Sequence, residues 1–142
     1  MIPRAHSGEL RALYIIGENP LVSDPDLNHA EKSMRNLDFL VVQDLFMTET
    51  AALADVVLPS ACFAEKEGTF TNSERRVQRV RKAVEPPGQA RDDWWPLCEI
   101  ATRMGYPMSY EDSRAIMKEI AAVTPSYGGI TYERIEEVGI HW

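Results

Sequence analysis

Residues 43–78 read QDLFMTETAALADVVLPSACFAEKEGTFTNSERRVQ, and they mark the point where an apolar strand gives way to polar loops. The strand is the run FLVVQ at residues 39–43, whose β-branched, apolar side chains are typical of a buried parallel strand. Gln43 and Asp44 lie at the end of this strand, so an amide and a carboxylate are placed next to each other where the chain leaves the sheet. The carboxyl end of a parallel strand is a common ligand-binding position.

A second strand precedes this one. Residues 13–16, LYII, form a short apolar run, and the GENP sequence at 17–20 stops it abruptly. Asp24 and Pro25 predict the cap and first residue of a helix that runs to about Arg35. A strand, a helix and a strand within about 30 residues predict a right-handed parallel crossover.

Further elements follow the central strand. Thr48 predicts the cap of a short helical stretch at 49–54, and residues 55–59 predict a third strand that Pro59 ends. The order of elements predicts an α/β domain with a parallel sheet. We expect residues 1–10 to be a flexible lead-in and residues 11–142 to form a single domain.

The chain from about residue 92 is expected to be mainly helical. Its first helix begins at Asp92 or Asp93 and ends with Gly105 as the C′ residue, a second begins at Ser109 or Asp112, and a last short helix covers 131–138. Residues 77–84 are expected to be extended, and the EPPG sequence at 85–88 to be a linker.

Charge and cysteine content restrict the function. The formal net charge of -7 argues against nucleic acid as a partner, because phosphate binding needs a basic face. The basic run at 75–82 is local: it fits either a phosphate site or a solvated strand. Cys62 and Cys98 lack the spacing of a zinc or iron–sulfur site and are interpreted as thiols of a reducing compartment. No run is apolar enough for a signal peptide or a membrane span, so a cytoplasmic protein is expected.

The candidate site lies at the two strand ends. If the first two strands are neighbours, the turns at 17–20 and 43–48 face one crevice, where Gly17 permits close backbone approach and Asp44 offers a carboxylate. The three histidines are scattered, and the sequence contains no nucleophile elbow and no GK[ST] phosphate loop. By itself the chain shows no catalytic centre.

Three blocks carry a resemblance to a known family. In order they are YIIGENPLVSDPD (14–26), FLVVQDLFMTETAALADVVLPSACFAEKEGTFTNSERRVQ (39–78) and WPLCEIATRMGYPM (95–108). They resemble the molybdopterin oxidoreductase superfamily over nearly the whole chain from about Leu13. Within it they look most like the catalytic (alpha) subunit of molybdenum- or tungsten-dependent formate dehydrogenases. Nitrate reductases and the large NADH-dehydrogenase subunit share the central blocks, so those alternatives stay open.

The resemblance implies a segment of a longer enzyme, with the α/β, Rossmann-like three-layer fold in which helices flank a short parallel sheet. Such enzymes hold a bis-molybdopterin guanine dinucleotide with Mo or W and a 4Fe-4S cluster, and the cluster motif and metal ligand are not found in this chain. The intact enzyme would oxidise formate to carbon dioxide and pass electrons to electron-transfer subunits. The partners implied here are the remaining domains of the catalytic subunit, and the isolated chain is expected to be inactive.

The resemblance also implies which residues meet the cofactor. The matching turn residues would lie against a guanine dinucleotide, and Asp44 is suited to accept two hydrogen bonds from the guanine edge. Asn19 and Ser23 would meet ribose or phosphate oxygens, and Thr48 would add a hydroxyl at the helix start. Residues 67–72 with Arg75 would lie nearer the pterin. Two other readings remain, a stand-alone nucleotide-binding module and a purely structural domain. The predicted cofactor-binding residues are Gly17, Glu18, Asn19, Ser23, Gln43, Asp44 and Thr48.

Overall fold

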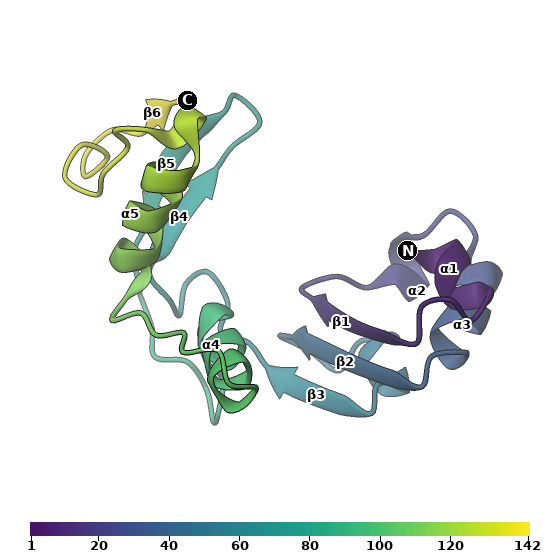
Figure 1. Ribbon diagram of the computed structural model, residues 1–142. Coiled ribbons are helices and arrows are strands. Elements are labelled where there is room, and N and C mark those ends of the chain that lie inside the picture. Colours follow the sequence, from purple (N-terminus) through teal and green to yellow (C-terminus); the bar gives the residue numbers. More distant parts are fainter. The chain divides into compact units, whose positions relative to one another are not determined.

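A computed structural model describes residues 1–142, which divide into two compact units (Figure 1). Unit 1 comprises Met1–Ser60 and Gly88–Asp93, and unit 2 comprises Ala61–Pro87 and Trp94–Trp142. Each unit has its own sheet and its own core, and the single α/β domain expected for residues 11–142 stays a prediction.

Unit 1 is built on a three-stranded parallel sheet. Its strand order is β1-β2-β3, and β1 pairs with β2 from Ala12↔Phe39 to Ile16↔Gln43. The predicted neighbouring parallel strands are therefore confirmed, and their carboxyl ends lie side by side. The elements are α1 (Ile2–His6), β1 (Ala12–Ile16), α2 (Pro20–Ser23), α3 (Leu27–Arg35), β2 (Phe39–Asp44), the 3-10 turn η1 (Ala51–Leu53) and β3 (Val56–Pro59).

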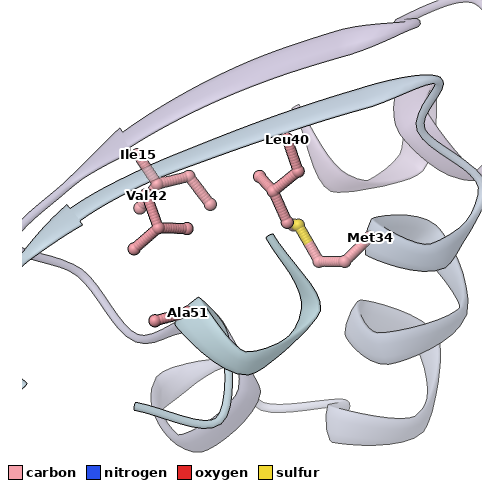
Figure 2. Packing of buried hydrophobic residues seen from close by; sticks show 5 residues of the cluster. All are labelled: Ile15, Met34, Leu40, Val42 and Ala51. Atoms are coloured by element: carbon pink, nitrogen blue, oxygen red, sulfur yellow. The ribbon is translucent and has the colours of Figure 1, made fainter. Parts of the chain in front are cut away.

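The core of unit 1 lies on one face of this sheet. Strand residues alternate between faces, so Ile15, Leu40 and Val42 point to the same side. There they meet Met34 of α3 and Ala51 of η1, as Figure 2 shows. Burying each large side chain of this cluster contributes about 1.5–3 kcal/mol, which fixes the sheet against its helices.

The region before α3 differs from the prediction. Asp24 adopts an extended backbone and ends α2, as expected for a residue that precedes a proline. The cap of α3 falls instead to Asp26, whose side chain accepts a hydrogen bond from the His29 amide at 3.0 Å. The expected flexible lead-in contains the short helix α1, in which Ala5 is fully buried.

Unit 2 is built on an antiparallel sheet of order β4-β5-β6. Strand β4 lies within the stretch expected to be a polar loop, where Phe70 and Thr71 pair with Gln78 and Val77. The unit's core is the buried cluster Val77, Met117, Ile130, Tyr132 and Ile135. Its elements are β4 (Gly68–Thr71), β5 (Arg76–Val80), α4 (Trp94–Arg103), α5 (Ser113–Val123), the 3-10 turn η2 (Pro125–Tyr127) and β6 (Ile140–His141).

Two helix ends in unit 2 agree with the sequence and one predicted helix is wrong. Gly105, the second residue after α4, has a positive φ of 91°, and Asp112 caps α5 by accepting from the Ala115 amide at 2.8 Å. Residues 131–138 form turns instead of a helix. Ile130 and Tyr132 are both buried although they are two residues apart, a spacing that would place them on opposite sides of a helix.

Candidate functional site

The candidate site is formed by two turns at the carboxyl ends of β1 and β2. We call residues 17–20 the first turn and residues 44–50 the second turn. The Gly17 amide donates to the Gln43 carbonyl at 2.9 Å, which continues the ladder between the strands into the first turn. Gly17 has a positive φ of 63°, and a Cβ built there would meet no atom within 4 Å. The first turn thus offers an open backbone surface.

Asn19 joins the first turn to the second. Its Oδ1 accepts from the Thr50 hydroxyl at 2.7 Å and from the Thr50 amide at 3.3 Å. Its Nδ2 donates to Glu49 Oε2 at 2.8 Å, and this hydrogen bond is the main reason that the pKa of Glu49 lies below its usual value. The side chain of Asn19, predicted to meet a ligand, is thus engaged within the protein.

Thr50 is a residue that sequence reasoning missed. It is fully buried and its hydroxyl also accepts a hydrogen bond from the Leu21 amide at 3.2 Å. The only signal in the sequence was a second threonine two positions after Thr48, within TETAAL. A threonine so close to a predicted helix start is usually a cap, so its long-range partners were not foreseeable.

Gln43 lies on the sheet face opposite the core cluster and is fully buried. The Tyr14 hydroxyl donates to its Oε1, and its Nε2 donates to the carboxylate and the carbonyl of Asp93 at 3.1 and 3.2 Å. The pKa of Tyr14 is raised mainly by burial and, to a smaller extent, by the charge of Asp93. The amide of Gln43 therefore anchors the returning segment 88–93 to the sheet.

The other predicted residues surround the two turns. Asp44 is half-buried, and its Oδ1 accepts from the Leu45 amide at 2.6 Å. Thr48 Oγ1 accepts from the Ala51 amide at 3.2 Å, although the residue at the N-cap of η1 is Thr50 and not the predicted Thr48. Ser23 donates to the Asn19 carbonyl at 3.2 Å, and Glu18 is exposed. Carboxylate and hydroxyl oxygens thus flank an open backbone.

A groove of about 540 Å³ runs beside β1 and reaches this site only in part. Glu18 and Ser23 line it, whereas Asp44 and Thr48 do not. Its remaining lining includes apolar residues such as Leu13 and Met34. The candidate site is therefore the surface at the strand ends, and the groove adjoins its edge.

The basic run of unit 2 is largely neutralised. Arg79 and Arg81 both pair with Glu136, at 2.9 and 2.8 Å, and Lys82 pairs with Glu85 at 2.5 Å. Arg79 also lies 4.1 Å from the centre of the Tyr132 ring, with its side chain only 7% exposed. These contacts favour a structural role for the run over a phosphate site.

Two further features concern the cysteines and the helices. Cys62 and Cys98 are free thiols, and no group of three His, Cys, Asp or Glu side chains is arranged to hold a metal ion. None of the helices has the length and apolar character needed to cross a membrane.

The chain belongs to the molybdopterin oxidoreductase family, whose family model matches residues 1–103. Among curated proteins, the chain is 59% identical over 135 residues to the "F420-dependent formate dehydrogenase subunit alpha" of Methanocaldococcus jannaschii, with 94% of this chain and 20% of that protein covered. It is 48% identical over 140 residues to "Formate dehydrogenase H" of Escherichia coli, covering 98% of this chain and 20% of that protein.

A solved structure resembles the fold as well. The acetylene hydratase from Pelobacter acetylenicus matches with a TM-score of 0.77 and 26% identity, covering 97% of this chain and 19% of that chain. The chain thus spans about one fifth of the length of the relatives that it matches.

Proposed function

We propose that this chain is a segment of the catalytic alpha subunit of a formate dehydrogenase, and that the complete enzyme oxidises formate to carbon dioxide. The support is the 59% identity to a formate dehydrogenase alpha subunit along 94% of the chain. The parallel sheet of unit 1 would be part of a Rossmann-like, three-layer domain that the rest of the enzyme completes.

The cofactor implied by the family fits the residues at the two turns. A Cβ would find open space at Gly17, so a flat or bulky group can approach the backbone there. The hydrogen bond from the Leu45 amide uses one lone pair of Asp44 Oδ1, which leaves Oδ2 and the second lone pair of Oδ1 for a ligand. A half-buried carboxylate beside an open backbone suits the N1–H and amine edge of guanine, which donates two parallel hydrogen bonds.

Each predicted residue of the site then has a proposed role. Asp44 would accept from guanine, and Gly17 and Glu18 would border the dinucleotide. The Thr48 hydroxyl would donate to a ribose or phosphate oxygen, whereas the Ser23 oxygen, whose hydrogen bonds the Asn19 carbonyl, would accept from a ribose hydroxyl. Gln43 and Asn19, whose side chains bond within the protein, would position the turns. When bound, the molybdopterin guanine dinucleotide with its Mo or W supplies the redox chemistry, and this segment supplies binding and orientation.

The remaining parts of the enzyme lie outside this segment. The 4Fe-4S cluster would be held elsewhere, because no described cluster of cysteines can hold one. Electron-transfer subunits would take the electrons, and the segment by itself would be inactive. Two free thiols support a reducing, cytoplasmic location for the complete enzyme.

The decisive experiment is a calorimetric titration of the chain with GMP, with AMP as the comparison nucleotide. We expect GMP to bind with a dissociation constant of roughly 0.1–1 mM, about -4 to -5.5 kcal/mol, and AMP to bind more weakly. Asp44→Asn should weaken GMP binding about tenfold or more, because the variant loses the charge and one acceptor oxygen.

The matched control is Asp38→Asn. Asp38 is an exposed carboxylate that precedes the other end of the same strand and pairs with Arg11, so this variant should bind GMP like the wild type. Equal binding of AMP, or an Asp44→Asn variant with unchanged affinity, would argue against guanine recognition by Asp44.

The substrate is tested in the longer protein that contains this segment. Formate-dependent reduction of an artificial electron acceptor is expected, whereas nitrate-dependent oxidation of a reduced dye is not. Activity with nitrate alone would instead place the protein with the nitrate reductase-like members of the family.

A further inference from the structure

One buried hydroxyl connects the two turns of the candidate site. Thr50 is fully buried, yet its side chain and its amide both reach the first turn. We propose that Thr50 is a positioning residue: it holds Asn19, and through Asn19 the first turn, in the place where a ligand bound at Asp44 meets the backbone of Gly17. The inference rests on the proposed function, which it extends to a residue that does not touch the ligand.

The hydrogen bonds around Thr50 form a closed set. Its hydroxyl donates to Asn19 Oδ1 at 2.7 Å and accepts from the Leu21 amide at 3.2 Å. The hydroxyl hydrogen is thereby used, and one lone pair is filled by the amide at the start of α2. A hydroxyl that both donates and accepts a hydrogen bond has a fixed orientation. The Thr50 hydroxyl therefore fixes Asn19 and Leu21 relative to each other.

Asn19 passes this restraint to the rest of the first turn. Its carbonyl accepts from the amides of Val22 and Ser23 at 2.9 and 3.0 Å and from the Ser23 hydroxyl at 3.2 Å. Its Nδ2 is held by Glu49, the neighbour of Thr50 in the second turn. One asparagine is therefore held by side-chain bonds to the second turn and by backbone bonds to α2.

Burial excludes direct ligand contact by Thr50. With no exposed surface, its hydroxyl cannot reach a molecule lying on the strand ends. The bond from the Gly17 amide to the Gln43 carbonyl holds the start of the first turn beside Asp44, and the bond between Thr50 and Asn19 restrains the other end of both turns. Such a preformed geometry lowers the ordering cost that a ligand would otherwise meet on binding.

The test compares Thr50→Val, Thr50→Ser and Ser33→Ala in the full chain. Valine keeps the shape of threonine and loses the hydroxyl, whereas serine keeps the hydroxyl. Ser33 is also fully buried in unit 1, but its hydroxyl donates to the His29 carbonyl within α3 at 2.6 Å. This hydrogen bond involves neither of the two turns. Ser33→Ala therefore reports the general effect of losing one buried hydroxyl.

Amide hydrogen exchange is the first readout. In Thr50→Val the amides of Leu21, Val22 and Ser23 should exchange about tenfold faster or more, while those of β2 change no more than in Ser33→Ala. Thr50→Ser should restore slow exchange. Unchanged exchange at these three amides in Thr50→Val, or equal acceleration there in Ser33→Ala, would overturn the proposal.

Titration with GMP is the second readout. Thr50→Val should weaken GMP binding about tenfold, and Thr50→Ser and Ser33→Ala should stay within about twofold of the wild type. Full GMP affinity in Thr50→Val, despite fast exchange at Leu21, would overturn the positioning role. If the wild type itself does not bind GMP, the proposed cofactor contact fails, and the exchange measurement still decides whether Thr50 holds the first turn.

Discussion

Gln43 shows how a single polar residue can serve the structure from a position that suggests ligand binding. It ends a strand, and its amide is nonetheless fully buried between Tyr14 and Asp93. A buried amide must have its hydrogen bonds satisfied, because an unsatisfied one costs about 1–3 kcal/mol. Here the partners are a tyrosine on the neighbouring strand and the segment that returns to unit 1.

We expect Gln43→Leu to lower the free energy of unfolding by about 1–3 kcal/mol, because it removes the amide that both Tyr14 and Asp93 use. The measurement is urea denaturation followed by circular dichroism. In the double variant Tyr14→Phe/Gln43→Leu the loss should be smaller than the sum of the single losses, since the tyrosine hydroxyl is then absent too.

Gln78→Leu is the control, because Gln78 is exposed on β5. It should change stability by less than about 0.5 kcal/mol. A Gln43→Leu variant as stable as the wild type would contradict the anchoring role.

At the scale of elements, the two-residue strand β6 depends on one glycine. Val77 pairs with Ile140, and the Gly139 carbonyl accepts from Arg76 Nη1 at 2.8 Å. A Cβ on Gly139 would lie 2.6 Å from the Val77 carbonyl oxygen and 2.6 Å from Gln78 Cγ. The backbone of β5 thus leaves no room for a side chain where the chain turns into β6.

Gly139→Ala is therefore expected to destabilise unit 2 by about 1–3 kcal/mol, the usual cost of inserting a methyl group into packed structure. Faster hydrogen exchange of the amides that join β5 and β6 is the specific sign. The control is Gly68→Ala on β4, where a Cβ would meet nothing within 4 Å. If both variants lose the same stability, close packing at Gly139 is not the cause.

At the scale of the whole molecule, the chain has a net charge of -7 and still forms ion pairs between its own side chains. Glu136 forms ion pairs with Arg79 and Arg81, and the hydrogen bond from Arg81 is the main reason that its pKa lies below the ordinary value of 4.5. The pKa of Glu133 is lowered as well, chiefly by its own backbone amide. A carboxylate whose pKa is lower in the folded state stabilises the fold above its unfolded pKa and loses that effect as the pH falls.

Glu136→Gln should consequently lower the urea midpoint of unfolding at pH 7, where the carboxylate is charged. Its difference from the wild type should shrink as the pH is lowered from 5 towards 3, because the wild-type carboxyl is then protonated as well. Glu137→Gln, which alters the exposed neighbour, is the control. A difference between Glu136→Gln and the wild type that is the same at pH 7 and pH 3 would show that charge is not responsible.

The sequence alone was enough to determine the order of strand, helix and strand and the parallel pairing of β1 and β2. It also determined the helix ends at Gly105 and Asp112. Each follows from residues close together in the chain, through apolar runs, caps and positive φ. The family followed as well, because its sequence blocks are contiguous.

Only the tertiary structure decided which polar side chains are free. Asn19 meets Thr50 across 31 positions, Gln43 meets Asp93 across 50, and Arg79 meets Glu136 across 57. The turns at 131–138 and the strand β6 were set in the same way, by packing against β5 and α5. Burial and long-range hydrogen bonds depend on where distant segments lie in space, and the local pattern around each residue does not contain that information.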